Sequence, residues 1–294
     1  MYTRRDLATL AIAGPLAAAF STRGAMAAGP KIDSKINGVM IGAQSYSFRD
    51  RDLDGCIAGM KEVGLGYVEL WQGHLEPDRK DSKEFLDNPP LAKIHEERKK
   101  FDDAGILLYA VNYSFRKNFT DKQIENGFAI AHALRVNKIT ASGNVSDAAR
   151  IDKFANKHKV YVGFHNHDSM HADEFSTPDD FAAAMKGNSK YIGINLDVGH
   201  FTAANFDPID YIEKMHTHIL TLHIKDRKKD HGDNMPFGQG DTNIKGVLEL
   251  LRTKKYPIPA MIEYEFGKDG VDTTLPDMKR SFGFIKTALG MLPS

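Results

Sequence analysis

Four short apolar runs in the second half of the chain each end in side chains that can bind a metal ion. They cover residues 161–167, 191–200, 219–225 and 259–265, and they are spaced as strand-and-helix units would space them. In a barrel of parallel strands, the residues at the carboxyl ends of the strands face one shared site. Two histidines, Asp197 and a glutamate arriving there would form a mixed nitrogen and oxygen site for a divalent ion. The pattern predicts a metalloenzyme.

Two of these runs offer residues whose roles stay open. His165 and His167 share one face of their strand, so only their depth separates a metal ligand from an acid or base. We assign the metal to His165 and proton transfer to His167. Lys225 ends its strand two residues after a histidine, where a buried ammonium would polarise a carbonyl or act as an acid. An ion pair of Lys225 with Glu265 or Asp226 is an equally open interpretation.

Strand-like and helix-like segments alternate along the chain, which indicates an α/β protein with a parallel sheet. Besides the four runs, strands are predicted at 38–45, 66–70, 106–112 and 138–142. Helices are predicted at 54–63, 91–104, 121–134, 148–157, 178–186, 208–215 and 244–253. Eight such units predict one (β/α)8 TIM barrel, and the first strand lacks the glycine-rich phosphate turn of a doubly wound sheet. The irregular stretches 72–90 and 227–243 are expected to form substrate-facing loops.

The first 27 residues have the features of an export signal. Arg4 and Arg5 precede an apolar stretch, 7–20, that is too short to span a membrane, and Ala25-Met26-Ala27 offers the small residues of a cleavage site. This order predicts a twin-arginine type signal and a periplasmic or secreted protein without a stable membrane anchor. An apolar N-terminal helix is the alternative. Residues 28–294 then form a single barrel domain, close to the roughly 250 residues typical of a TIM barrel.

Composition narrows the partners of that domain. Residues 28–294 hold 36 basic and 38 acidic residues, because Arg4, Arg5, Arg23 and Asp6 fall in the signal. A net charge of −2 gives no basic surface for phosphate neutralisation, so nucleic acid is not an expected partner. The single cysteine, Cys56, excludes an internal disulfide and is expected in the core.

Motifs in this order resemble those of the xylose-isomerase-like TIM barrel superfamily, often called sugar phosphate isomerases/epimerases. They are Gln44-Ser-Tyr-Ser-Phe48, Gly66-Tyr-Val-Glu69-Leu, Phe164-His-Asn-His-Asp168, Asp197-Val-Gly-His200, His223-Ile-Lys-Asp226-Arg227 and Ile262-Glu263-Tyr-Glu265. The resemblance implies one Mn²⁺, Mg²⁺, Co²⁺ or Zn²⁺ ion. Its ligands would be His165, Asp197, His223 and Glu263.

One position departs from the ketose epimerases of this superfamily. Their fifth strand carries a glutamate that shares proton transfer with the glutamate of the eighth strand, and here His165 stands in its place. Glu263 then remains as the catalytic base, with His167 and Lys225 as partners. The sequence His165-Asn-His167 at the end of this strand resembles that of the inosose dehydratases and 3-keto-glycoside lyases, which share the same barrel. The resemblance therefore implies an isomerase or epimerase type enzyme acting by enolisation, with a lyase or dehydratase as the alternative.

The substrate is expected to be a small unphosphorylated sugar or keto-sugar, because export and the lack of a phosphate clamp both disfavour a sugar phosphate. His200 is assigned by resemblance to a substrate oxygen or to support of the ligands. Glu69 would bind substrate or bridge to Lys138 or Arg116. Aromatic platforms for a sugar ring are expected from Tyr46, Phe48 and Trp71, with Asn112 and Arg227 as further substrate-binding residues.

Two other classes of protein fit the sequence less well. A DNA-repair barrel of the endonuclease IV type needs three metals and histidines on its second and third strands, where this chain has Glu69 and Asn112. A non-enzymatic sugar-binding barrel would need no metal and leaves four ligand-bearing strands unexplained.

Overall fold

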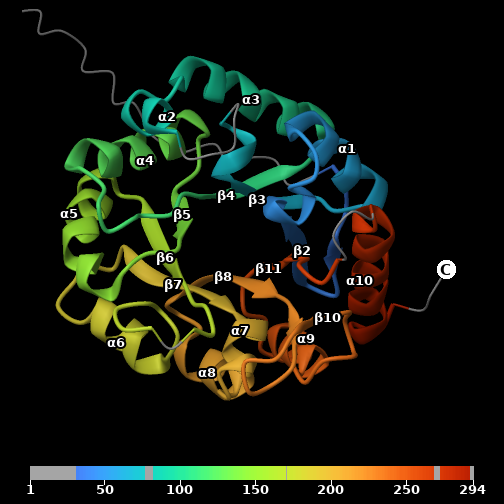
Figure 1. Cartoon of the computed structure of the whole chain (residues 1–294). Helices are drawn as coiled ribbons and strands as arrows, with labels where there is room; N and C mark the ends of the chain where they lie inside the picture. The colour runs from blue at the N-terminus through green and yellow to red at the C-terminus, as the bar shows by residue number, and fades with distance from the viewer. Residues whose placement is uncertain (1–30, 77–81, 170, 268–271, 292–294) are drawn as a thin grey trace, which may run out of the picture.

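Eight parallel strands close into a barrel with the helices arranged around it (Figure 1). The computed structural model describes residues 31–76, 82–169, 171–267 and 272–291. Each strand pairs with the next, and the first pairs with both the second and the last, which closes the sheet. The strands are β2 (Val39–Gln44), β3 (Tyr67–Trp71), β4 (Leu107–Asn112), β5 (Lys138–Ala141), β6 (Tyr161–His165), β7 (Ile192–Asp197), β8 (Ile219–Ile224) and β11 (Ala260–Ile262). The predicted barrel is confirmed, whereas the predicted signal lies outside the described residues.

The seven predicted helices are present, with ends that differ from the prediction by at most one residue. They are α1 (Leu53–Val63), α3 (Leu91–Ala104), α4 (Asp121–Ala133), α5 (Ala148–His158), α6 (Pro178–Met185), α8 (Pro208–Met215) and α9 (Ile244–Lys254). Their ends follow local chemistry. Asp52 caps the start of α1, and Gly64 ends it with φ of 90°, a left-handed conformation that glycine adopts at little cost.

Several elements were not predicted. A last helix, α10 (Thr274–Ala288), and short α2 (Lys83–Asp87) and α7 (Val198–Ala203) complete the ring, and β1 (Lys35–Ile36) pairs antiparallel with β2. The stretch 227–243 was predicted to be irregular, yet β9 (Asp226–Arg227) and β10 (Asn234–Met235) form a small antiparallel ladder there. The Asp226 carboxylate accepts backbone N–H bonds from Gly238, Gly240 and Thr242, which orders this loop.

The core lies between the barrel and the helices. The strands are buried on both faces, as the apolar runs require, and Cys56 is buried among the apolar side chains. No helix in the described ranges is long and apolar enough to cross a membrane. Because the strands are buried along their length, the polar side chains that could form a site gather at the carboxyl ends of the strands.

Candidate metal centre and active site

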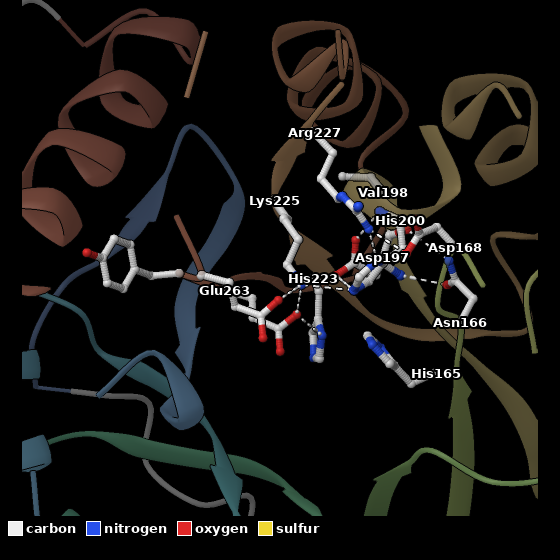
Figure 2. Close-up of polar contacts among 12 residues, drawn as sticks. His165, Asn166, Asp168, Asp197, Val198, His200, His223, Lys225, Arg227 and Glu263 are labelled. Atoms are coloured by element: carbon white, nitrogen blue, oxygen red, sulfur yellow. Dashed lines mark hydrogen bonds and ion pairs between the residues drawn. The ribbon is translucent and has the colours of Figure 1, made fainter. Parts of the chain in front are cut away.

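The four predicted metal ligands meet at the carboxyl end of the barrel. His165 ends β6, Asp197 ends β7, His223 lies on β8, and Glu263 follows β11 directly. All four are buried, and each offers one ligand atom within 4.8 Å of the others. Figure 2 shows His165, His223 and Glu263 converging on one space. The arrangement forms a candidate site for one divalent ion.

The residues fit a bound cation by charge and by hydrogen bonding. Asp197 Oδ2 is buried and accepts no hydrogen bond from any described residue, although the Lys225 ammonium lies 3.3 Å from it. The site holds four carboxylates, those of Glu69, Asp197, Glu263 and Glu265, and one ammonium, that of Lys225. With these groups ionised and the histidines neutral, as ligands must be, the cluster carries a net charge of −3, and a divalent ion would bring it to −1. Without the ion, a proton on His223 would still leave a net charge of −2. Such an excess of buried negative charge is costly without a cation.

His223 is held between two carboxylates. Its Nε2 lies 2.9 Å from Glu69 Oε1, and its Nδ1 lies 3.2 Å from Glu263 Oε2. Burial alone would lower the pKa of His223, but the charges of Glu69 and Glu263 outweigh it and raise the pKa well above its usual value. The same neighbours act on Glu263: burial opposes ionisation, yet Lys225 and His223 hold its pKa well below the usual range. Without a metal, the imidazole is therefore protonated between two carboxylates.

His165 is prepared to bind as a neutral ligand. Its Nδ1 lies 3.0 Å from Asn195 Oδ1, an amide oxygen that only accepts, so Nδ1 carries the hydrogen and Nε2 keeps its lone pair. Burial, followed by the neighbouring His223 and His167, lowers the pKa of His165 well below its usual value. Asn195 was missed at the sequence level, although a polar residue inside the apolar run 192–196 was a usable signal.

Depth separates His167 from His165, as the prediction required. His165 is buried, whereas His167 is half-buried and lines the open cavity, with 4.9 Å between the two ring centres. Burial and the nearby His200 and Lys225 lower the pKa of His167. Its neutral imidazole is thus available to accept a proton from a ligand in the cavity.

Asn166, between the two histidines, fixes the backbone of Asp197. Its Oδ1 accepts from Asp197 N at 2.9 Å, and its Nδ2 donates to Asp197 O at 3.1 Å (Figure 2). The side chain of Asp197 accepts from His200 N at 2.7 Å and so caps the start of α7. The sequence did not reveal the role of Asn166, because its partner lies on the neighbouring strand.

Lys225 makes the ion pair left open by the sequence, and it also lines the cavity. Its Nζ lies 2.6 Å from Glu265, 2.9 Å from Glu263 and 3.3 Å from Asp197. Burial opposes its charge, but these carboxylates outweigh burial and raise its pKa. Asp226, the other predicted partner, accepts backbone N–H bonds instead. Lys225 is therefore a fixed ammonium that donates hydrogen bonds, and an easy proton release near neutral pH is not supported.

His200 is oriented by a second set of contacts behind the metal site. Lys225 Nζ lies 3.0 Å from His200 Nε2, and His200 Nδ1 lies 2.7 Å from Arg227 Nη1 and 3.2 Å from Asp168 Oδ1. Arg227 Nη1 also donates to Asp168 Oδ1, at 2.5 Å. The hydrogen bond from His200, with the Arg227 guanidinium beside it, holds the pKa of Asp168 well below its usual range.

A cavity of about 320 Å³ opens above the four ligands. Of the residues predicted to bind substrate, it is lined by Tyr46, Trp71, Asn112 and His200. The rings of Tyr46 and Trp71 meet edge to face with 5.0 Å between their centres and form one wall. The lining also includes residues that were not predicted to bind substrate: Gln44, Ser114, Ser142 and Glu265.

Three predicted substrate contacts lie elsewhere. Glu69 is completely buried beneath His223 and accepts from Thr140 Oγ1 at 2.6 Å, so it bridges to neither Lys138 nor Arg116 in the described contacts. Arg227 lies behind His200 and is not among the residues that line the cavity. Phe48 is fully buried in the core, so its prediction as a ring platform was wrong.

Comparison with known proteins agrees with this geometry. The family model described as "Xylose isomerase-like TIM barrel" matches residues 143–287. An uncharacterized protein of Methanocaldococcus jannaschii is 26% identical over 132 residues, 44% of this chain and 45% of its own length. L-ribulose-5-phosphate 3-epimerase UlaE of Salmonella paratyphi A is 29% identical over 76 residues, 26% of this chain and 27% of its own. The chain thus spans less than half of the length of these curated relatives.

Solved structures share the fold at low sequence identity. The IOLI protein with a bound zinc atom has a TM-score of 0.67 at 14% identity, over 86% of this chain and 99% of that one. The probable 3-DHS dehydratase AsbF of Bacillus anthracis has a TM-score of 0.65 at 15% identity, over 84% and 99%. Residues 143–287 thus match the xylose isomerase-like TIM barrel model, the matched relatives include an L-ribulose-5-phosphate 3-epimerase, and the described residues hold a buried cluster that could bind a metal ion.

Proposed function

We propose that the protein is a metal-dependent enzyme of the sugar isomerase/epimerase type. It would remove a proton from the carbon next to a carbonyl of an unphosphorylated sugar or keto-sugar. The observation that carries this proposal is the buried cluster of His165, Asp197, His223 and Glu263, three of which, His165, His223 and Glu263, line a polar cavity. A purely sugar-binding barrel has no need for such a cluster.

The four clustered side chains would hold the ion. A divalent ion there supplies positive charge that polarises a sugar carbonyl and favours enolisation. The nature of the metal is left open by the donor set, since imidazole and carboxylate suit several divalent ions.

The chain's own residues supply proton transfer and orientation. Glu263 stays a carboxylate and can accept the proton from carbon, because Lys225 and His223 favour its charged form. Lys225 is fixed by three carboxylates beside the cavity, and its positive charge would favour negative charge that develops on a substrate oxygen. His167 lines the same cavity and would return or relay the proton. Trp71 and Tyr46 offer apolar ring faces to the sugar.

A second candidate is a lyase or dehydratase of the same barrel. It is favoured by His165, which leaves one carboxylate, Glu263, and one imidazole, His167, as an unequal acid and base pair. Such a pair suits expulsion of a substituent better than reversible inversion at one carbon. The first shared step, removal of the proton beside the carbonyl, is the same in both candidates.

The decisive experiment measures metal content and then solvent deuterium uptake. The purified protein, loaded in turn with Mn²⁺, Mg²⁺, Co²⁺ or Zn²⁺, is incubated in D2O with free ketoses and 3-keto-glycosides. We expect metal-dependent deuterium incorporation beside the carbonyl of at least one sugar. Metal-free protein that still binds sugars without exchange would support the binding barrel instead.

A further inference from the structure

A second cavity adjoins the active site. It has a volume of about 560 Å³, and three residues, Ser114, Ser142 and His167, line both it and the metal-site cavity. The two cavities therefore lie side by side, with Ser114, Ser142 and His167 at their boundary. Both volumes fall within the roughly 300–1,000 Å³ of ordinary small-molecule sites. A single sugar unit held at the metal would leave the second cavity unfilled.

The boundary presents unused hydroxyl groups. Beyond the ends of β4 and β5 the two chain segments stay side by side, because Phe115 N donates to Ser142 O at 2.9 Å. This contact places Ser114 and Ser142 next to each other on the two segments. Neither hydroxyl hydrogen-bonds to another described residue. Both are half-buried, so they are available to a ligand that runs from one cavity into the other.

The outer wall of the second cavity is fixed by hydrogen bonds within the chain. Asn144 and Glu174 form an isolated antiparallel bridge, and Asn144 Nδ2 donates to Asp173 O at 3.2 Å. Asp173 in turn accepts from Ser146 N at 2.8 Å, and Glu174 accepts from Ser169 Oγ at 2.6 Å. The wall is thus held in place before any ligand arrives.

The charges of this cavity favour a neutral occupant. Arg116 and Lys117 line it together with the Glu174 carboxylate, and Lys117 is already paired with Asp173 at 3.3 Å. A phosphate group would meet the Glu174 carboxylate. The remaining polar lining consists of hydroxyl and amide groups, including those of Asn118 and Asn144, which suit sugar hydroxyls.

We propose that this second cavity binds a second, neutral sugar unit, so that the substrate is a disaccharide or glycoside and not a free monosaccharide. The inference rests on the proposed enolisation, and it adds where the rest of the substrate lies. The keto-sugar unit occupies the metal-site cavity, the linkage passes His167, Ser114 and Ser142, and the second unit fills the space beside Asn118 and Asn144.

The test compares matched one-unit and two-unit substrates with the metal-loaded full chain. The pairs are D-fructose with lactulose, and methyl 3-keto-glucoside with 3-keto-maltose; fructose 6-phosphate tests an anionic occupant. We expect kcat/KM for deuterium exchange to be about tenfold higher for the two-unit member of the preferred pair, the gain of one or two hydrogen bonds. Asn118→Trp fills the cavity from an exposed position and should bring this ratio close to one.

Two further variants test whether the effect is specific to the second cavity. Asn144→Trp, in the wall formed with Glu174, should lower the same ratio, whereas Asn156→Trp, the same change at an exposed position of α5, should leave it unaltered. Equal kcat/KM for both members of each pair, or a preference for fructose 6-phosphate, would overturn the inference while leaving enolisation intact. Absence of exchange with every sugar would instead remove the proposed function. Calorimetric binding of lactulose and fructose to wild type and Asn118→Trp would then decide the cavity's role.

Discussion

Glu69→Gln should weaken metal binding although Glu69 does not belong to the four ligands. The carboxylate lies beneath the site, and its Oε1 accepts from His223 Nε2 at 2.9 Å. A histidine that binds a metal through one ring nitrogen is commonly oriented by a carboxylate at the other. The amide introduced by this substitution would keep an oxygen acceptor of the same shape but lose the negative charge. The perturbation therefore tests the charge of the contact and leaves the packing nearly unchanged.

The size of the effect follows from this one hydrogen bond. A bond to a charged group contributes about 1.5–3 kcal/mol, and a neutral one contributes roughly half as much. The loss of about 1–1.5 kcal/mol corresponds to a rise in the metal Kd of about tenfold, measured at a pH above the raised pKa of His223, where no proton competes with the metal. This value is at the lower end of the roughly 10–100-fold range known for such supporting residues.

Proton release distinguishes this role from a structural one. The pKa of His223 is raised by Glu69 and Glu263, so the wild-type imidazole is protonated near neutral pH and must lose its proton if it is to bind the metal. Metal affinity should therefore increase with pH until pH passes the raised pKa. In the metal-free protein, the stabilising contribution of His223 is complete below about pH 6.5 and is lost as pH rises through its folded-state pKa. Glu69→Gln should shift both transitions to lower pH.

Isothermal titration calorimetry with Mn²⁺ in buffers of different ionisation enthalpy measures Kd and released protons together. Thr140→Val is the matched control, because Thr140 Oγ1 donates to the same Glu69 oxygen at 2.6 Å without contacting His223. We expect this control to change Kd less than Glu69→Gln does. A Glu69→Gln protein with Kd within about twofold of wild type and the same proton release would refute the reasoning.

Three further outcomes are expected. Asp197→Ala should lose most of its metal, measured by elemental analysis. Circular dichroism should still show a folded barrel, because the substitution removes the cap of α7, about 1 kcal/mol, and one of the three carboxylates around Lys225, which keeps Glu263 and Glu265. A full metal complement would contradict the assignment. His167→Ala should lower turnover strongly while the metal content stays unchanged. C3 epimerisation of simple ketoses by the wild type should be slow or absent. Fast, reversible epimerisation would contradict the proposal that Glu263 and His167 act as an unequal acid and base pair. The protein should be cleaved near Ala27 on export, and replacing Arg4-Arg5 by Lys-Lys should block export. A full-length cytoplasmic product of the wild type, found by intact-mass analysis, would exclude the predicted export signal.

The barrel was predictable because its signals are local. Buried strands are short apolar runs, and helix ends carry their own caps, such as Asp52 and Gly64 around α1. The short elements within loops were not predictable in this way. The β9–β10 ladder depends on Asp226 accepting from backbone groups 12 to 16 residues later, and no periodicity records such contacts.

The four candidate ligands could also be predicted from the sequence, since each of them lies at or next to the carboxyl end of an apolar run. The residues that hold these ligands in place could not be predicted from the sequence, because each of them contacts a ligand on another strand. Glu69 on β3 reaches His223 on β8, and Asn166 reaches the backbone of Asp197 on β7. In each case the side chain's type was suggestive, but its depth in the barrel decided whether it met the substrate cavity or the underside of a ligand.

Lys225 shows why the two open interpretations of one residue need not exclude each other. The sequence offered an ion pair or a catalytic ammonium, and the structure gives one group that pairs with Glu265 and lines the cavity. Its contacts with Asp197 and Glu263 mean that two of the metal's carboxylates are shared with a fixed positive charge. A monovalent ammonium alone leaves the four carboxylates undercompensated, and a divalent ion alone would leave Glu265 without its partner. The two cations together bring the buried charge close to balance, so Lys225 and the metal are best understood as parts of one site.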